Sequence, residues 1–300
     1  IIESDESDGS FLKIPFNYSI VTNIDNEHLD FYKNIKNLKN KFVEFLHKTP
    51  SLGKSFICLD DKNVKNILPN LKNKNYYTYG IDRKSNFFIY NIVQTKTYSK
   101  FSIRIKIPGK KKIIKNIFIP LLGLHNIKNA TSALAVAFSI GVSDKIIKLG
   151  LKNFKGVQRR FNYLFRKGKT SFFDDYAHHP TEIRSVLDGV RKVYTEEEIV
   201  CIFQPHRVSR LKLLKKEFSK CFIKANTILL CPVYKAGEKI KLGFKYDSFA
   251  KSIAKNSKVN LIMLNDEQDL KKIINNIAFG NKIFIAMGAG SISNWIRNLN

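Results

Sequence analysis

The stretch TSFFDDYAHHPTEIRSVLDGV, residues 170–190, contains an apolar run, a polar turn and an amphipathic segment in direct succession. The run TSFFD has the length and the aromatic content of a buried strand. Apolar residues then recur at helical spacing through residues 181–194, and Pro180 stands just before them, where proline is favoured at a helix start. The stretch therefore predicts one strand, one tight turn and one helix.

The same order of strand and helix repeats to the end of the chain. Four further apolar runs predict strands, namely IVCIF (199–203), TILLC (227–231), VNLIML (259–264) and KIFIAM (282–287). Helical patterns lie between them in residues 208–222, 247–255 and 267–277. This alternation is typical of a parallel sheet with helices on its faces, and ligands bind such sheets at the carboxyl ends of the strands. Candidate site residues are therefore expected in DDYAHHP, QPHRVSR and GAGS, which follow three of the predicted strands.

The first half of the chain has a different organisation. SIVTNI (19–24) and SFICLD (55–60) predict strands on either side of a helix in residues 33–48. From residue 76 to 120 the apolar side chains alternate with a period of two around a Pro-Gly turn, which predicts antiparallel strands. The small residues after Gly123 predict a closely packed helix that ends at Gly141. The whole chain is thus expected to be of the α/β class.

The composition is strongly basic, with 52 Lys and Arg against 25 Asp and Glu and a formal net charge of +27. We interpret most of this charge as a solvated lysine-rich surface. A basic nucleic-acid-binding protein is the alternative, but no nucleic-acid-binding signature accompanies the lysines, so no such partner is expected. No apolar run has membrane-spanning length, so no membrane partner is expected either.

The four cysteines do not form a CxxC pair, and three of them lie in apolar runs that predict strands. A disulfide or zinc framework is therefore not expected. Buried free thiols are the predicted state, as in a cytoplasmic protein.

Two acids, a tyrosine and two histidines crowd the turn in DDYAHHP. Capping of the following helix by Asp or by Thr181 would explain one acid but not the other side chains. A metal site that uses His178 and His179 is a second possibility, and a metal-dependent hydrolase would be the corresponding function. Adjacent histidines in a turn point in different directions, which argues against this metal site.

QPHRVSR places Arg207 and Arg210 three residues apart at a helix start. Side chains at this spacing share one helical face, and the helix dipole there favours anions. Two guanidinium groups suit a carboxylate or a phosphate. A solvated helix start is the alternative interpretation.

Four acids, Glu3, Asp5, Glu6 and Asp8, follow the apolar start of the chain, and His28 follows the SIVTNI strand. Hard carboxylates and one imidazole near neighbouring strand ends could hold Mg²⁺. Turn caps and surface acids would give the same pattern, so both interpretations remain open.

Taken together, seven blocks of this sequence resemble the Mur ligases, and they occur in the same order. The blocks are ESDESDGSFL (3–12), TNIDNEHLDFY (22–32), GLHNIKNATSALAVA (123–137), FKGVQRRF (154–161), DDYAHHPTEI (174–183), FQPHRVSR (203–210) and GAGS (288–291). The resemblance implies that residues 1–157 are the remainder of a P-loop-type central ATPase domain. It implies that residues 158–300 are a Rossmann-like C-terminal domain with a mostly parallel sheet.

The branch of the family that the chain resembles joins L-alanine to UDP-N-acetylmuramate in peptidoglycan precursor synthesis, with ATP and Mg²⁺. The resemblance implies that ATP phosphorylates the muramic acid carboxylate and that the amine of L-alanine attacks the acyl phosphate. The murein tripeptide ligase of cell-wall recycling is the alternative within the family, but it resembles this chain less at ESDESD and at FQPHRVSR.

By motif position the resemblance implies Glu3 and His28 as metal ligands. It implies that Asn129, with His125 and Asn126, contacts the adenine.

In the C-terminal half, the resemblance implies ATP contacts at Arg160 and Asp175. It also implies that four residues bind the substrates: Tyr176, His178, Arg207 and Arg210. His178, Arg207 and Arg210 are expected to be catalytic as well. The two arginines of this group would hold the alanine carboxylate.

The chain departs from the family pattern in two respects. No G-x-x-x-x-G-K-[ST] block occurs in it, so we expect a C-terminal fragment that is inactive alone, because this block cradles phosphates. Glu27 also precedes His28, where the family usually has Asp. Other branches carry a carbamylated lysine downstream of this histidine. Lys39 lies nearby, and we assign no role to it.

Overall fold

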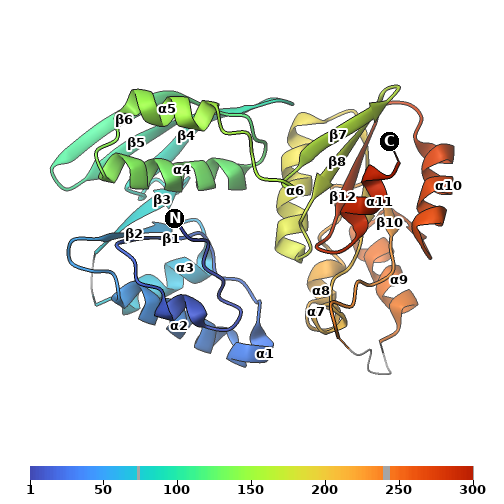
Figure 1. Ribbon diagram of the computed structural model, residues 1–300, viewed down its shortest axis with the longest axis horizontal. Coiled ribbons are helices and arrows are strands. Elements are labelled where there is room, and N and C mark those ends of the chain that lie inside the picture. The colour runs from blue at the N-terminus through green and yellow to red at the C-terminus, as the bar shows by residue number, and fades with distance from the viewer. Residues whose placement is uncertain (73–74, 239–243, 300) are drawn as a thin grey trace. The chain divides into compact units, whose positions relative to one another are not determined.

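The computed structural model describes residues 1–72, 75–238 and 244–299, which form two compact units, Ile1–Phe154 and Lys155–Asn300 (Figure 1). Each unit contains one six-stranded sheet. The first unit ends at Phe154, three residues before the boundary after residue 157 that the sequence predicts.

The sheet of the first unit has the strand order β1-β2-β3-β4-β5-β6. Its first four strands pair in parallel, and the last two continue the sheet antiparallel: β1 (Tyr18–Val21), β2 (Lys54–Cys58), β3 (Tyr76–Gly80), β4 (Phe87–Gln94), β5 (Ser99–Ile107) and β6 (Lys110–Ile119). The prediction of antiparallel strands is confirmed for β4–β6 and wrong for β3. A period of two does not encode strand direction, and the helical crossover before β3 makes it parallel to β2.

Helices lie on both faces of the central strands of this unit. They are η1 (Ser10–Lys13), α1 (Leu29–Tyr32), α2 (Ile35–His47), α3 (Lys62–Ile67), η2 (Leu68–Asn70), α4 (Leu124–Ser139) and α5 (Asp144–Lys152). Successive side chains of β2 point to opposite faces. Ile57 packs in the core with α2 and α3, whereas Phe56 and Cys58 pack in the core with α4.

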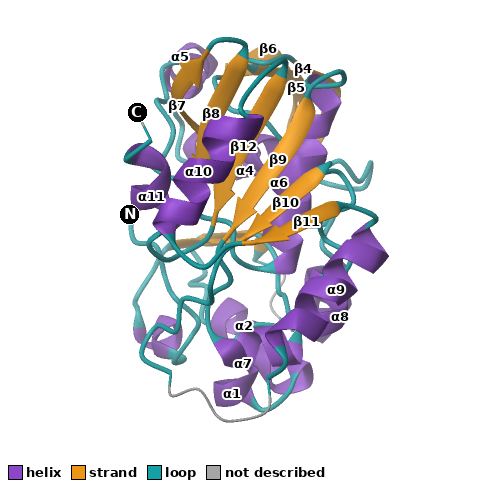
Figure 2. Ribbon diagram, turned by 90° about the vertical axis from the view of Figure 1, so that its right-hand side faces the viewer, coloured by secondary structure: helices purple, strands orange, loops and turns teal. Residues whose placement is uncertain are grey.

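The sheet of the second unit has the order β11-β10-β9-β12-β8-β7 (Figure 2). Its strands are β7 (Asn162–Lys167), β8 (Thr170–Asp175), β9 (Glu198–Phe203), β10 (Thr227–Leu230), β11 (Asn260–Met263) and β12 (Lys282–Met287). The predicted parallel sheet is confirmed for β8–β12. The sequence analysis missed β7, which forms an antiparallel hairpin with β8 around Gly168 at φ 57°.

The helices of this unit are α6 (Pro180–Val193), α7 (Val208–Leu213), α8 (Lys215–Phe218), α9 (Tyr246–Ser257), α10 (Glu267–Ile277) and α11 (Ile292–Arg297). The single helix predicted for residues 208–222 is wrong. Leu214, at φ −108° and ψ 25°, leaves the helical region and separates α7 from α8. The apolar spacing continues across this break, so the sequence pattern alone did not reveal it.

The strand order brings three predicted site segments to one edge of the sheet. Because β12 lies between β8 and β9, the register sets Met287 beside both Asp175 and Phe203. DDYAHHP, GAGS and QPHRVSR therefore leave the sheet from adjacent strand ends, which are the arrowheads of β8, β12 and β9 in Figure 2.

All four cysteines are buried and free of disulfides, as predicted. None of the helices in the described ranges has the length and apolar character that a membrane span requires.

Candidate functional site

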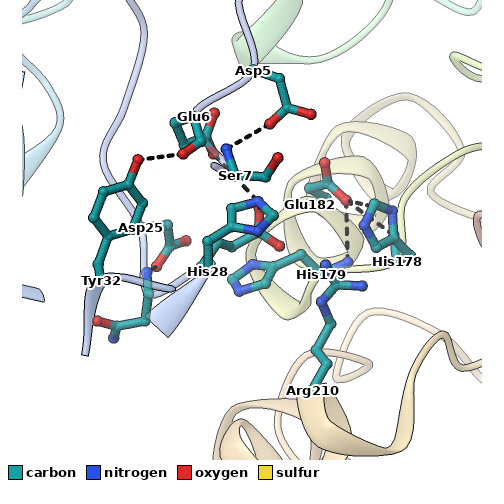
Figure 3. A network of polar contacts seen from close by, with 12 residues as sticks. Asp5, Glu6, Ser7, Asp25, His28, Tyr32, His178, His179, Glu182 and Arg210 are labelled. Atoms are coloured by element: carbon teal, nitrogen blue, oxygen red, sulfur yellow. Dashed lines mark hydrogen bonds and ion pairs between the residues drawn. The ribbon is translucent and has the colours of Figure 1, made fainter. Parts of the chain in front are cut away.

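Glu6, Glu27 and His28 form the only group of three or more potential metal ligands among the described residues. The His28 Nε2 atom lies 3.7 Å from Glu6 Oε1 and 3.9 Å from Glu27 Oε2. All three side chains are half-buried. His28 adopts a left-handed backbone at φ 54° just before α1, and the Tyr32 hydroxyl donates a hydrogen bond to the Glu6 carbonyl (Figure 3). Helix α1 thus joins the two segments that carry the cluster.

Other acids of this region serve local turns. Asp5 Oδ1 accepts from the Ser7 amide at 2.8 Å, and Asp8 Oδ1 accepts from the Ser10 amide at 2.9 Å. Asp25 Oδ1 accepts from the Asn26 amide at 2.8 Å. Glu3 is exposed and lies outside the cluster. The turn-cap interpretation therefore holds for Asp5 and Asp8 among the four acids to which it applied. The metal role of Glu3 stays a prediction, and Glu6 is the better-placed candidate.

The donor set fits a divalent cation. Burial raises the pKa of Glu6, the nearby His28 opposes that rise, and Glu27 adds to it. Two crowded carboxylates favour a bound cation because it removes their mutual repulsion. Ligands of one Mg²⁺ lie roughly 3–4 Å apart, given metal–oxygen distances of about 2.1 Å. The observed separations from His28 fall in this range.

The start of α4 contains the residues predicted to contact adenine. The Asn126 side chain donates to the Leu122 carbonyl at 2.6 Å, and Asn129 is exposed. The His125 ring lies against Gly123, where a Cβ atom would stand 2.6 Å from the ring. Gly123, at φ 91°, thus permits this close approach. Asn126 stabilises the first turn of α4, and the second turn presents Asn129 at the surface.

Asp174 and Asp175 at the end of β8 are both buried and bonded within the protein. Asp174 Oδ2 accepts from Ser293 Oγ at 2.5 Å and from the Arg297 guanidinium at 3.1 Å, which ties β8 to α11. The two oxygens of Asp175 accept from the Phe161 amide at 2.8 Å and the Ala177 amide at 2.7 Å. Burial raises the pKa of Asp175 to about 6. Asp175 therefore holds the turns on both sides of the β7–β8 hairpin.

The cap of α6 differs from the prediction of Asp or Thr181. His179 Nδ1 accepts from the Thr181 amide at 3.3 Å, and the Glu182 carboxylate accepts from the amides of His178 and His179 at 3.0 and 3.1 Å (Figure 3). This reciprocal arrangement is a capping box in which an imidazole replaces the usual hydroxyl. The structure thus gives His179 a structural role, which leaves the proposed two-histidine metal site without support.

Tyr176 and His178 stand at the exit of the same turn. The Tyr176 ring is 36% exposed, with the guanidinium groups of Arg159 and Arg160 at 4.8 and 5.8 Å from its centroid. His178 Nδ1 lies 3.0 Å from the Tyr176 carbonyl and 3.5 Å from a Glu182 oxygen. The pKa of Glu182 is lowered, because His178 and two amides outweigh the effect of its burial. Tyr176, His178 and Arg160 thus gather at one strand end.

His206 joins this group from the end of β9. Its ring centroid lies 5.5 Å from that of His178, and it stacks on Tyr234 at 5.6 Å. The Arg210 guanidinium lies 3.2 Å from His206 Nδ1. Burial lowers the pKa of His206 to about 4, and the neighbouring His178 and arginines add to this effect. His206 is therefore a neutral ring at neutral pH that connects His178 to Arg210.

Arg207 and Arg210 do not both lie within a helix, as their spacing had predicted. Arg207 is the residue before α7, with φ 64°, and only Arg210 lies within the helix. The Arg207 amide donates to the Tyr234 carbonyl at 2.9 Å, because the chain turns at this point to pair with the segment after β10. The spacing argument for a shared helical face therefore does not apply to Arg207.

GAGS packs closely against the end of β9. A Cβ atom at Gly288, where φ is 153°, would stand 2.8 Å from the Gln204 carbonyl. The Gln204 side chain donates to Ser291 Oγ at 3.0 Å and accepts from the Ile292 amide at 3.1 Å. Arg159 also donates to the Gly288 carbonyl. The glycines thus allow three strand ends to meet.

Sequence reasoning did not assign Glu27, Glu182 or His206 to the site. Glu27 and His206 lie inside blocks that the sequence analysis quoted, and Glu182 stands three residues after the N-cap, which is the position of the acid in a capping box. Each could have been found from its position relative to an assigned neighbour.

Each of the two units matches a domain of known proteins. Residues 2–137 match the Mur ligase middle domain, and residues 159–290 match the Mur ligase glutamate ligase domain. The chain belongs to the Mur ligase family.

Individual Mur ligases match along the whole chain. The UDP-N-acetylmuramate–L-alanine ligase of Pelagibacter ubique is 63% identical over 300 residues, which cover all of this chain and 65% of that protein. The enzyme of the same name from Rhodospirillum rubrum is 36% identical, over 62% of its length. The crystal structure of UDP-N-acetylmuramate-alanine ligase from Thermotoga maritima superposes with a TM-score of 0.76 at 26% identity, over 98% of this chain and 61% of that one. The chain therefore spans less than two thirds of the length of these Mur ligases.

Proposed function

We propose that this chain provides the middle and C-terminal domains of an enzyme that joins L-alanine to UDP-N-acetylmuramate with ATP. The observation that carries the proposal is the 63% identity to the Pelagibacter ligase over all 300 residues. The proposed route is phosphorylation of the muramic acid carboxylate, followed by attack of the L-alanine amine on the acyl phosphate.

In this proposal Glu6, Glu27 and His28 would hold Mg²⁺. When bound, the ion would neutralise phosphate charge and bring the nucleotide close to a carboxylate that otherwise repels it. The separations of 3.7 and 3.9 Å around His28 support this assignment. Glu6 replaces Glu3 as the preferred ligand.

His125 and Asn129 would contact the adenine, and Asn126 would keep the first turn of α4 in place through Leu122. Arg160 is exposed and free to reach phosphate oxygens. Asp175 would act by positioning, because its carboxylate holds the amide of Phe161, the residue after Arg160.

Tyr176 and His178 would face the muramic acid and the reacting carboxylate. Arg207 and Arg210 would hold the carboxylate of L-alanine and so direct its amine. His206 would orient Arg210, because its Nδ1 atom lies 3.2 Å from that guanidinium and its lowered pKa keeps the ring neutral.

The direct test is a chimera of the Pelagibacter ligase in which this chain replaces the matching region. We expect ADP release that requires both UDP-N-acetylmuramate and L-alanine. Turnover with a murein tripeptide in place of L-alanine would instead assign the recycling activity. ADP release without any amino acid or peptide would contradict both.

The 300-residue chain by itself is expected not to ligate, because no G-x-x-x-x-G-K-[ST] block is available to position the γ-phosphate. Phosphate release is measured with the purified chain, ATP, Mg²⁺ and both substrates. L-Alanine-dependent release at an enzymatic rate would refute this expectation.

The metal assignment is tested in the chain itself with Mn²⁺ as a paramagnetic substitute for Mg²⁺. Glu6→Gln is expected to weaken Mn²⁺ binding about tenfold, since one of two carboxylates is lost, whereas the control Glu3→Gln leaves it unchanged. Equal losses in both variants would restore Glu3 as a candidate ligand.

A further inference from the structure

Among the described residues of the first unit, no hydrophobic core packs against the outer face of β4, β5 and β6. Phe87, Phe101 and Ile103 belong to the core that also contains residues of α4 and α5. These two helices lie beside β4–β6 in Figure 1. The opposite core, around α2 and α3, includes described residues of β1, β2 and β3 but none of β4–β6. The alternate side chains of these strands therefore form a separate surface, the outer face, which consists of Phe88, Tyr90, Lys100, Arg104, Lys106, Lys111, Ile113 and Phe118.

This part of the chain carries charge of only one sign. Residues 87–119 contain eight Lys or Arg and no Asp or Glu. One of these cations, Lys112, pairs with Asp144 at 2.8 Å. Two cations of the outer face, Lys106 and Lys111, lie directly opposite one another on β5 and β6. Like charges in register destabilise a sheet, so an anion that covers them gains interaction energy.

Aromatic rings alternate with these cations across the strands. Phe88 and Tyr90 on β4 stack with centroids 5.8 Å apart and planes 6° apart. The Arg104 guanidinium lies 4.7 Å above Phe88, and Lys100 lies 5.5 Å above Phe118 on β6. The aromatic rings thus lie on β4 and β6, and three of the four cations of the outer face lie on β5 between them: Lys100, Arg104 and Lys106.

Protection of a sheet edge does not account for this arrangement. Lysines often prevent edge strands from aggregating, and this explains the lysines of β6. Lys100 and Arg104 lie on β5, which pairs with a strand on each side. A paired strand has no free edge to protect, so these two cations call for another explanation.

We propose that the outer face of β4–β6 binds single-stranded nucleic acid. Basic side chains contact the phosphates of such ligands, and aromatic side chains on a sheet stack with their bases. The outer face offers both groups in alternation. This activity does not depend on the proposed ligase function, and it revises the sequence-based expectation that the lysines are only solvated.

The test is fluorescence anisotropy of a labelled 20-nucleotide oligothymidylate with the full 300-residue chain over a salt series. Lys100→Gln with Arg104→Gln is expected to weaken binding fivefold or more. It should also reduce the slope of log K against log salt concentration by about 1.4, since each of the two lost phosphate contacts contributes about 0.7. The matched control is Lys251→Gln with Lys255→Gln on α9, which removes the same charge from exposed positions of the second unit. The control is expected to change the affinity less than twofold.

A second pair of variants separates nucleic acid from other anions. Tyr90→Leu is expected to weaken oligothymidylate binding about fivefold or more through lost stacking. Binding to poly-L-glutamate and to phosphatidylglycerol vesicles should not change. Phe118→Leu serves in its place if circular dichroism shows that Tyr90→Leu is unfolded. Equal losses in the two charge-removal variants, or unchanged binding by both aromatic variants, would overturn the proposal.

Discussion

The two sheets differ in how completely each unit buries its own strands. In the second unit every residue of β10 is buried, as are five of the six in β9 and in β12. In the first unit the edge strand β1 alternates exposed and buried residues, with Tyr18 39% and Ile20 42% exposed. The edge strand β11 of the second unit is exposed in the same way, with Ile262 39% and Met263 40% exposed, so the feature that sets the first unit apart is the basic face on β4–β6.

The candidate site residues of the two units differ in how the rest of the protein holds their side chains. Asp174, Asp175 and Glu182 are held by hydrogen bonds to the protein, so the second site is preorganised. In the first site, Glu6 Oε1 and Glu27 Oε2 lie 3.7 and 3.9 Å from His28 Nε2. A cluster with two carboxylates gains from a bound cation, which suggests that the first site is completed by its ligand.

The largest expected effect is a difference in autonomous folding. Residues 155–300 are expected to be soluble and to unfold cooperatively alone, because the core of this unit is complete. Residues 1–154 are expected to aggregate, because this segment has both an exposed apolar edge at β1 and a face of β4–β6 that no core of the described residues covers. Circular dichroism melts and sedimentation of both segments, with the whole chain as reference, measure the difference. A soluble, cooperative 1–154 beside an unfolded 155–300 would reverse the comparison.

The buried hydrogen bonds of Asp174 are expected to contribute to the free energy of unfolding of the second unit. Asp174→Ala is expected to destabilise the chain by about 2–3 kcal/mol, because Ser293 and Arg297 lose their buried acceptor. Ser293→Ala, which removes one donor only, is expected to cost about 1 kcal/mol. Urea unfolding measures both variants. Equal effects would mean that the carboxylate contributes little beyond its contact with the hydroxyl group.

The next effect concerns substrate binding by Arg210 in the second unit. In the chimera, Arg210→Lys is expected to raise the KM for L-alanine about tenfold, because lysine keeps the charge but loses the planar fork. The KM for ATP should change little, as should all constants of the control Arg184→Lys on α6. A rise in the KM for ATP alone would assign Arg210 to nucleotide phosphate.

The sequence correctly predicted those helices and strands in which apolar residues form continuous runs or recur at regular spacing. β8, β9, β10 and β12 follow from continuous apolar runs because both faces of the sheet are buried along these strands, and α10 follows from its helical apolar spacing. β3 was given the wrong direction because alternation is the same in parallel and antiparallel strands. The break at Leu214 was missed because the apolar positions on both sides still face one core.

Within the site, motifs predicted the segments better than the individual atoms. Glu3 and Glu6 lie three residues apart in one acidic run, and only the fold shows which of them reaches His28. Arg207 leaves the helix because its amide pairs with Tyr234, a contact between distant segments. The histidine cap of α6 replaces the usual residue types, so a search for the usual caps overlooks it.

The smallest expected effect concerns Asp175, and it tests whether the second site is as preorganised as its hydrogen bonds indicate. Burial raises the pKa of this carboxyl from 3.8 to about 6, so the folded state binds its proton more tightly than the unfolded state does. The resulting stabilisation is fully present below pH 4 and is lost as the pH rises through 6. Between pH 5 and pH 6.5 the wild type should lose about 1 kcal/mol relative to Asp175→Asn, which has no proton to release. Urea unfolding of both proteins at several pH values measures this difference. If the two stability curves run parallel from pH 4 to 7, the two amide donors offset the burial of Asp175, and the carboxylate is held without strain.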